Sequence, residues 1–219
     1  MTFDTQALIL SLKLALCTLF FLIPFGIWAA YQLAHSKKNK SLLEASLALP
    51  LVLPPTVLGY YLLVTFSGVQ LFNQPLVFTF TGLVIASIIF NLPFAIQPIQ
   101  RAFEAINPDI REAAQVSGLS NWQIFHLIEL PLAWRGITSA AVLTFAHTLG
   151  EFGVILMVGG AIPRETKTVS IAIYDKVQSF DTAGAGSLSL FLLGISLVAI
   201  ALSYGVFGRS RRHQRLRGK

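Results

Sequence analysis

The sequence predicts an all-α integral membrane protein, a polytopic bundle of five transmembrane helices. Three observations support this fold class. Of the 219 residues 54% are apolar, only 12% are charged, and the apolar residues gather into long runs. A bilayer core of about 30 Å requires roughly 20 consecutive apolar residues for one helical crossing. The basic residues fall mainly between alternate runs, which is typical of membrane proteins with a fixed orientation.

Five runs are long enough to cross the membrane, and none shows the polar alternation of a water-exposed helix or strand. They lie at approximately residues 7–34, 46–66, 76–99, 134–158 and 187–207. No linker rich in glycine and serine divides them, so residues 1–219 are expected to form a single transmembrane domain. The first run follows Asp4 without a preceding basic residue and exceeds a signal-peptide core in length, which favours a retained span.

The distribution of charge predicts the orientation. Basic residues cluster after the first run, around the central loop and after the last run: Lys37, Lys38, Lys40, Arg101, Arg111, Arg135, Arg209, Arg211, Arg212, Arg215, Arg217 and Lys219. The positive-inside rule therefore places the N-terminus outside and the C-terminus in the cytoplasm, together with residues 35–44, 100–133 and 208–219. The tail 208–219 is interpreted as an orientation signal that contacts lipid headgroups, and not as a nucleic-acid site.

The segment from about residue 159 to residue 186 is too polar for a simple lipid-facing crossing. Glycines and Pro163 punctuate its ends, and Thr168 to Val177 are expected to form a short helix at the outer face. A sixth crossing here is the alternative. It would place the C-terminal arginines outside, against the charge rule.

The second apolar run contains Pro50, Pro54 and Pro55, followed by Thr56. Each proline lacks a backbone donor and clashes with the preceding turn of a helix. Interrupted helices at membrane depth persist only where protein or a water-filled cavity satisfies the freed carbonyls. Two interpretations remain open: a kink packed against neighbouring helices, and a bend that lines a path across the membrane.

The central cytoplasmic loop, residues 101–133, is expected to form two short helices joined by a tight turn. Asn107 can cap a helix that begins at Pro108, and Gly118 suits the left-handed position that ends it. Ser120 and Gln123 have the spacing of a capping box and start the second helix. We expect Pro131 to end that helix, because the residue before a proline avoids helical geometry.

The two loop helices present different faces. Ala113 and Ala114 give the first helix a small-residue face that permits close approach of another surface. Trp122, Phe125 and Ile128 are expected to anchor the second helix to the membrane domain.

A known signature lies in this loop: Glu112, Ala113, Ala114, Gly118, Ile128, Leu130 and Pro131. Their spacing resembles the EAA motif of bacterial ABC importer permeases. The resemblance implies that the loop is a coupling helix seated in a cleft of a separate ATPase subunit. A DNA-binding helix-turn-helix is the alternative reading. It is disfavoured because residues 121–130 contain no Lys or Arg for phosphate contacts and the loop lies between hydrophobic runs.

The resemblance extends to Leu49–Gly59, Thr148–Gly153 and Ile162–Thr168, which are similar to stretches of the molybdate permeases in this family. It implies a homodimer in the bacterial inner membrane, with two ATPase subunits inside and an oxyanion-binding protein outside. Molybdate or tungstate is the implied substrate, and sulfate or thiosulfate is the alternative. The resemblance implies that glycine is frequent at the position of Arg164, so this residue departs from the family pattern.

Glu151, between Gly150 and Gly153, interrupts an otherwise apolar run. A carboxylate in a membrane is costly unless it is paired, hydrated or protonated. A structural partner within the bundle and a gating role together with Pro54, Pro55 and Thr56 are both considered. His147 precedes Glu151 by one helical turn, so the two side chains can meet. A packed histidine is preferred to a proton relay.

On the outer side, Arg164, Glu165 and Lys167 form a polar cluster, either a solvated loop or a contact for the binding protein. The only cysteine, Cys17, is interpreted as a packing residue.

The sequence has no phosphate-binding loop, no catalytic motif and no metal-ligand cluster. We therefore expect a transporter subunit that is not an enzyme and binds no cofactor, with energy supplied by a partner chain. An ion-coupled secondary transporter and an intramembrane protease that uses His147 are the rivals.

Overall fold

The computed structural model describes residues 4–36, 40–71 and 74–216, with side chains described as far as Ala201. Lys37, Lys38, Arg217 and Lys219 of the predicted basic clusters lie outside the described residues. The fold is helical, apart from a small antiparallel hairpin of β1 (Gln70–Leu71) and β2 (Gln74–Pro75). This agrees with the predicted all-α class.

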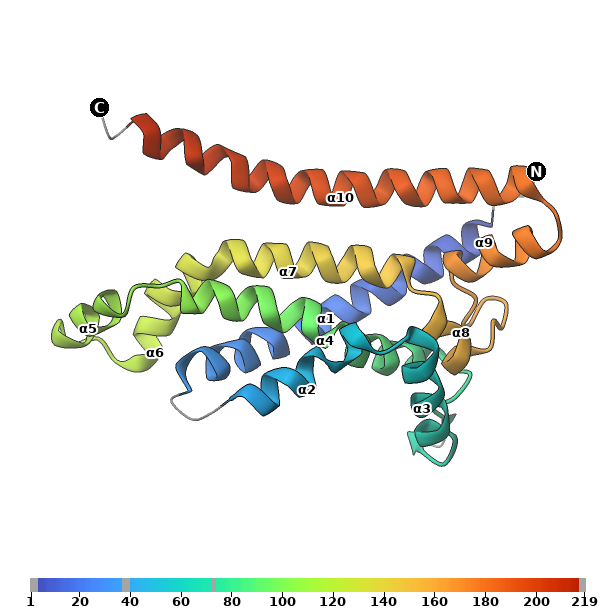
Figure 1. Ribbon diagram of the computed structural model, residues 1–219, viewed down its shortest axis with the longest axis horizontal. Coiled ribbons are helices and arrows are strands. Elements are labelled where there is room, and N and C mark those ends of the chain that lie inside the picture. The colour runs from blue at the N-terminus through green and yellow to red at the C-terminus, as the bar shows by residue number, and fades with distance from the viewer. Residues whose placement is uncertain (1–3, 37–39, 72–73, 217–219) are drawn as a thin grey trace.

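Four long helices run along the longest axis of the molecule: α1 (Thr5–His35), α4 (Phe80–Glu104), α7 (Leu130–Gly150) and α10 (Thr182–Leu216) (Figure 1). The short helices α5 (Pro108–Val116) and α6 (Asn121–Ile124) lie at one end of the bundle. The helices α3 (Pro55–Ser67), α8 (Gly153–Gly159) and α9 (Val169–Gln178) lie towards the other end. Both ends of the bundle therefore carry irregular structure, and the middle is regular.

Among the described residues, three helices are long and apolar enough to cross a membrane: α1, α4 and the part of α10 at Thr182–Ala201. Two bent helix pairs raise this number to five if each pair is one span. Each of the five predicted runs thus falls on a candidate span or a bent pair. The ten-residue α9 covers most of the short helix expected at Thr168–Val177.

Small residues bring the central helices close together. Ala95 of α4 is fully buried, and a Cβ added to Gly26 of α1 would lie 3.4 Å from the Ala95 Cβ. A Cβ added to Gly136 of α7 would lie only 2.4 Å from the Cβ of Ala102. Helix association in lipid depends on such close packing, because the lipid tails are as apolar as the side chains. The pairs α1–α4 and α4–α7 form the centre of the bundle.

The second predicted run is not one straight helix. It divides into α2 (Ser41–Val52) and α3, which meet at an angle of 107°. Leu53 and Pro54 have extended backbone angles, with ψ of 137° and 134°, because each precedes a proline. Pro50 lies inside α2, and Pro93 and Pro98 lie inside α4, without ending those helices. Two adjacent prolines therefore break the helix where single prolines do not.

The fourth run also bends, by 60°, between Gly150 and Gly153. Its beginning differs from the prediction, because the helix does not end at Pro131. The segment Asn121–Gly150 is continuous and passes through a π-helical turn, η1 (Phe125–Glu129). The N–H of Leu130 bonds the carbonyl of Phe125, five residues earlier. Such a widened turn shifts the carbonyls that a proline ring would otherwise strike, which is how the helix accommodates Pro131.

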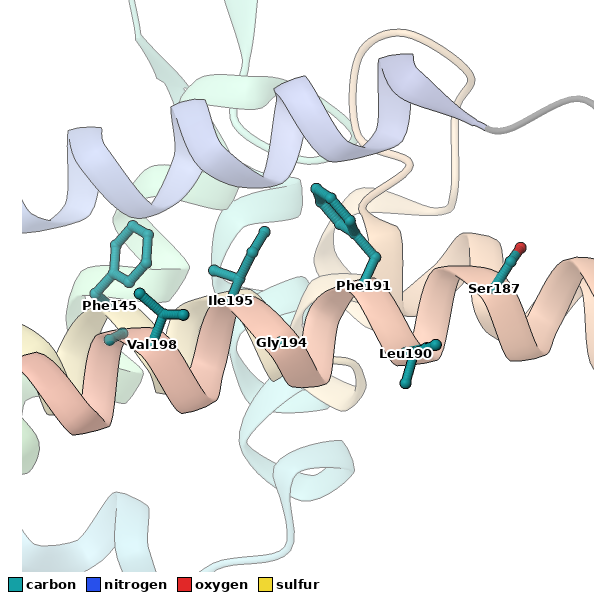
Figure 2. Close-up of a pocket in the computed structure, with 8 residues that line it drawn as sticks. Phe145, Ser187, Leu190, Phe191, Gly194, Ile195 and Val198 are labelled. Carbon is teal, nitrogen blue, oxygen red and sulfur yellow. The ribbon is translucent and has the colours of Figure 1, made fainter.

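The last helix, α10, packs less closely than α1 and α4, since 17% of its candidate span is buried, against 39% and 61% of theirs. Phe145 of α7 and Phe191, Ile195 and Val198 of α10 line an open groove of about 680 Å³ (Figure 2). None of its lining residues is charged, so the groove suits hydrocarbon.

Candidate functional site

The loop at the α5 end has the local structure that its sequence predicts. The side chain of Asn107 accepts a hydrogen bond from the N–H of Asp109 at 3.0 Å, and α5 begins at Pro108. Gly118 has a φ of +84°, the left-handed region that favours glycine. The capping box of Ser120 and Gln123 is formed in both directions. Four local signals thus fix a rigid helix–turn–helix.

The free face of α5 is smaller than expected. Glu112 and Ala113 are exposed, whereas Ala114 is 6% exposed and faces the bundle. Val116 is 91% exposed and adds an apolar side chain to this face. Sequence reasoning missed Val116, although an isolated valine in a polar helix was a usable signal. The exposed face suits a partner protein.

The anchor of the second loop helix also differs from the prediction. Trp122 is 71% exposed, whereas Ile124 is fully buried. Phe125 packs edge-on against the ring of Tyr31. Phe125 is partly buried as predicted, whereas Ile124 of α6, which precedes the π-helical turn, takes the inward position expected of Trp122. Ile128 and Leu130 are partly buried, and Pro131 is exposed.

A buried carboxylate lies beneath this loop, at Glu129 in η1, and sequence reasoning assigned it no role. Its Oε1 accepts hydrogen bonds from Arg111 of α5 at 2.8 Å and from His35 of α1 at 3.0 Å. Arg111 also donates to the Tyr31 hydroxyl, and this bond, followed by that to Glu129, raises the pKa of Arg111 above its ordinary value. The guanidinium therefore stays charged in the fold.

At the opposite end, the two bends meet. A Cβ added to Gly153 would lie 2.8 Å from the Cβ of Pro55 and 3.4 Å from the backbone nitrogen of Thr56. A Cβ added to Gly59 would lie 2.9 Å from the Cβ of Met157, so α3 and α8 pack backbone against backbone. The structure thus brings together candidate residues from both bent runs. Pro54, Pro55, Thr56 and Gly150 are exposed.

Glu151 lies at the bend itself and is 6% exposed. Its carboxylate accepts a hydrogen bond from the N–H of Val154 at 2.9 Å, in the first turn of α8. Its backbone carbonyl accepts a hydrogen bond from the Ser170 hydroxyl. The side chain therefore serves as the cap that the break between α7 and α8 requires.

His147 does not pair with Glu151. Its Nδ1 bonds the Oδ1 of Asn91 at 3.0 Å, and its ring stacks on Phe94 with 4.0 Å between centroids. Asn91 in turn donates to Ser87, which accepts from the Thr18 hydroxyl at 3.1 Å. These groups satisfy one another across α1, α4 and α7, as the preferred interpretation of a packed histidine expects.

The outer polar cluster is partly paired. Arg164 has a φ of +69° and donates to the Oε1 of Gln6 at 3.2 Å. Lys167 forms an ion pair with Asp175 at 2.6 Å, and Glu165 is exposed. The positive φ of Arg164 explains in physical terms why glycine suits this position. Within the described ranges, the structure has no group of three or more His, Cys, Asp or Glu arranged to hold a metal.

An apolar helical bundle with two bent spans and a capped helix–turn–helix projecting from one end defines the membrane-embedded domain of a transporter. The chain belongs to the family described as binding-protein-dependent transport system inner membrane component, whose sequence model matches residues 22–213. It is accordingly a multi-pass protein of the inner membrane, and the predicted family resemblance is confirmed.

Curated relatives include the molybdenum transport system permease protein ModB of Azotobacter vinelandii, 44% identical over 86% of this chain and 89% of the relative. ModB of Escherichia coli K12 is 36% identical, covering 91% and 92%. The sulfate transport system permease protein CysT of Escherichia coli K12 is 29% identical, covering 80% and 66%. The chain is thus more similar to these molybdenum permeases than to CysT.

Solved structures share the fold. A bacterial alginate ABC transporter, solved in complex with a periplasmic protein bound to alginate pentasaccharide, superimposes with a TM-score of 0.75 at 21% identity. The match covers 95% of this chain and 80% of that one. The arrangement of helices is therefore that of an ABC transporter membrane subunit.

The cap at the bend generates a prediction. Glu151→Ala removes the acceptor for the Val154 N–H and should cost about 1 kcal/mol of local stability, as loss of a helix cap does. Transport should fall, whereas Glu151→Gln, which keeps an acceptor oxygen, should retain most of it. Hydrogen exchange at residues 153–159 and substrate uptake at equal membrane abundance measure both effects. Normal uptake by the alanine variant would remove Glu151 from the transport machinery.

Proposed function

We propose that this chain is the permease subunit of a binding-protein-dependent ABC importer for molybdate or tungstate. It works as a homodimer with two ATP-binding subunits and an extracytoplasmic oxyanion-binding protein. Sequence identity of 36–44% to ModB proteins, against 29% to a sulfate permease, supports this substrate class. A sulfate or thiosulfate importer is the alternative. ATP hydrolysis belongs to the partner chain, and this chain binds no cofactor.

The proposed topology has five crossings within one domain of residues 1–219, with the N-terminus outside and the C-terminus in the cytoplasm. The loop 101–133 and the tail 208–219 then lie in the cytoplasm. Two features support this orientation. The α5 end of the bundle carries Lys40, Arg101 and Arg111, and α10 runs back towards that end (Figure 1).

The observation that carries the proposal is the loop around α5, with its exposed Glu112, Ala113 and Val116. In the proposed mechanism this face seats in a cleft of the ATPase. Glu112 fixes the loop, the exposed Ala113 allows close approach of the ATPase, the buried Ala114 packs within the loop, and Gly118 makes the turn. The remaining residues proposed to couple the loop to the ATPase lie where the loop enters the membrane: Ile128, Leu130 and Pro131. ATP binding draws two such loops together, and hydrolysis releases them.

The bends at the other end are the proposed gate. Pro55 and Thr56, which follow Pro54 on one span, lie against Gly153 on the other, next to Gly150 and the cap Glu151. When α7 moves with the loop, this contact would shift and open or close the path. Direct binding of the anion by Glu151 is not expected, because like charges repel.

Arg164, Glu165 and Lys167 are the proposed contact for the binding protein, on the outer loop between α8 and α9. Lys167 is already paired with Asp175, so Arg164 and Glu165 are the residues more available to a partner.

Uptake assays test the substrate and the energy source. The chain is reconstituted in vesicles with its cognate ATPase and binding protein, and labelled molybdate, tungstate and sulfate are supplied in competition. Uptake of molybdate or tungstate should require ATP and the binding protein. It should also require the ATPase subunit, because this chain has no phosphate-binding loop of its own. Preferred uptake of sulfate would assign the alternative substrate. Uptake that persists without the ATPase would identify an ion-coupled transporter and reject the proposal.

The turn at Gly118 gives a second prediction. No atom lies within 4 Å of a Cβ added there, so a substitution acts only through the backbone, at a φ of +84°. Gly118→Val should cost about 1–2 kcal/mol and uncouple ATP hydrolysis from uptake. Gly118→Asn should be milder, because Asn tolerates left-handed geometry. Gly68→Val, at an equally open site with ordinary φ, is the control. Unimpaired coupling in Gly118→Val would contradict the proposed role of the turn.

The outer loop gives a third prediction. Arg164→Glu reverses a charge on the proposed docking surface and should weaken binding of the loaded binding protein, with Arg164→Gln in between. The affinity of the loaded binding protein for the permease is measured in lipid nanodiscs at low and high salt. The difference between variants should shrink at high salt, because salt screens interactions between surface charges. Equal affinities of all three proteins would show that this loop is only solvated.

A further inference from the structure

The root of the α5 loop holds a carboxylate that is almost fully buried, Glu129 at 2% exposure. Its Oε1 accepts charge-assisted hydrogen bonds from Arg111 at 2.8 Å and His35 at 3.0 Å. The Nδ1 of His35 faces the carbonyl of Tyr31 at 2.9 Å. Both ring nitrogens of His35 therefore lie within hydrogen-bond distance of an oxygen. One buried carboxylate thus accepts hydrogen bonds from α5 and from α1.

Arg111 links more elements than a simple pair would. Beyond Glu129, it donates to the Tyr31 hydroxyl at 3.0 Å and to the Asn121 Oδ1 at 3.3 Å. The ring of Tyr31 packs edge-on against Phe103 of α4 and against η1. Within the described part of the chain, Arg111 is the residue of α5 whose side-chain hydrogen bonds reach α1 and η1. Any movement of α5 must therefore act on this group or break it.

The contact between Arg111 and Glu129 can act on distant residues, because the helix that holds Glu129 continues beyond η1. The segment Asn121–Gly150 runs without a break from the loop to the bend at Glu151. Removing one partner of a buried ion pair leaves an uncompensated charge, which is strongly unfavourable. It is therefore easier for α5 to carry η1 and α7 with it than to part from them.

The second oxygen of Glu129 adds an option for movement. Oε2 is buried and has no hydrogen-bond partner among the described residues. A guanidinium can bind both oxygens of a carboxylate at once, so the pair has a second arrangement available to it. With two arrangements available, Arg111 and Glu129 can stay paired while the angle between α5 and η1 changes.

We propose that Arg111 and Glu129, supported by His35 and Tyr31, are the positioning residues that transmit movement of α5 to α1 and α7. This inference rests on the proposed ABC importer function. It assigns a role to Arg111 on α5, Glu129 in η1, and Tyr31 and His35 on α1, and it treats the ion pair as a mechanical joint between α5 and the bundle.

The test uses the complete transporter in vesicles and measures substrate uptake per ATP hydrolysed. Glu129→Gln and Arg111→Met should each lower this ratio at least about fivefold, the lower range of couplings between sites. Arg111→Lys keeps the charge but loses the forked geometry, and should fall in between. If Glu129→Gln or Arg111→Met fails to insert into the membrane, the uptake ratio of Arg111→Lys still tests the proposal. The control is Arg101→Met, which removes an arginine whose side chain is 80% exposed and pairs with Glu104 at 3.1 Å.

A double variant and a hydrogen-exchange measurement distinguish two roles of the ion pair: transmitting movement of α5, and only stabilising the fold of the loop. Arg111→Met with Glu129→Gln should be no worse than the more damaging single change, since residues of one unit are not additive. Hydrogen exchange at residues 108–116 should rise in the single variants. Faster exchange with an unchanged uptake ratio, an additive double variant, or an equal loss in Arg101→Met would each overturn the joint. Absence of ATP-driven uptake in the unaltered transporter would reject the importer function itself, and the joint with it.

Discussion

Every break in a membrane helix exposes backbone groups that lipid cannot satisfy, and this constraint governs where the present chain departs from straight helices. The bend between α7 and α8 is tolerated because the Glu151 carboxylate bonds the N–H of Val154. The bend between α2 and α3 relies on two prolines, which have no N–H to satisfy. The Glu151 carboxylate and the proline pair are each unfavourable inside a membrane. Each nevertheless lowers the free energy of the fold, because it avoids an unpaired backbone N–H, which would be more unfavourable.

The two bends are also related in space. Both lie away from the α5 loop, and they touch through Gly153, Pro55 and Thr56. At the loop end, the helix instead stays continuous through Pro131 by widening into a π turn. The chain is therefore helical without interruption from Asn121 to the bend after Gly150. A continuous helix of this kind transmits a displacement over the length of the bundle better than a succession of short helices.

Local signals explain how much of this was predictable. The caps at Asn107 and Ser120 and the turn at Gly118 depend on neighbours within a few residues, so sequence placed them correctly. The buried role of Glu129 was missed because its partner His35 is 94 residues away. The π turn, and the burial of Ile124 in place of Trp122, were missed for a related reason, because both depend on tertiary packing. Adjacent prolines predicted a break in the second run, but not its 107° angle.

The interior of this chain is a poor path for an anion, and the proposed homodimer offers another. His147, Asn91, Ser87 and Thr18 form a chain of hydrogen bonds across α1, α4 and α7, each group serving its neighbour. An anion passing there would have to displace bonds that hold the bundle together, at membrane depth and without water to replace them. The exposed surface around Thr56 and Gly150 has no such conflict. A homodimer that encloses this surface would provide the path while leaving the packed interior of each copy intact.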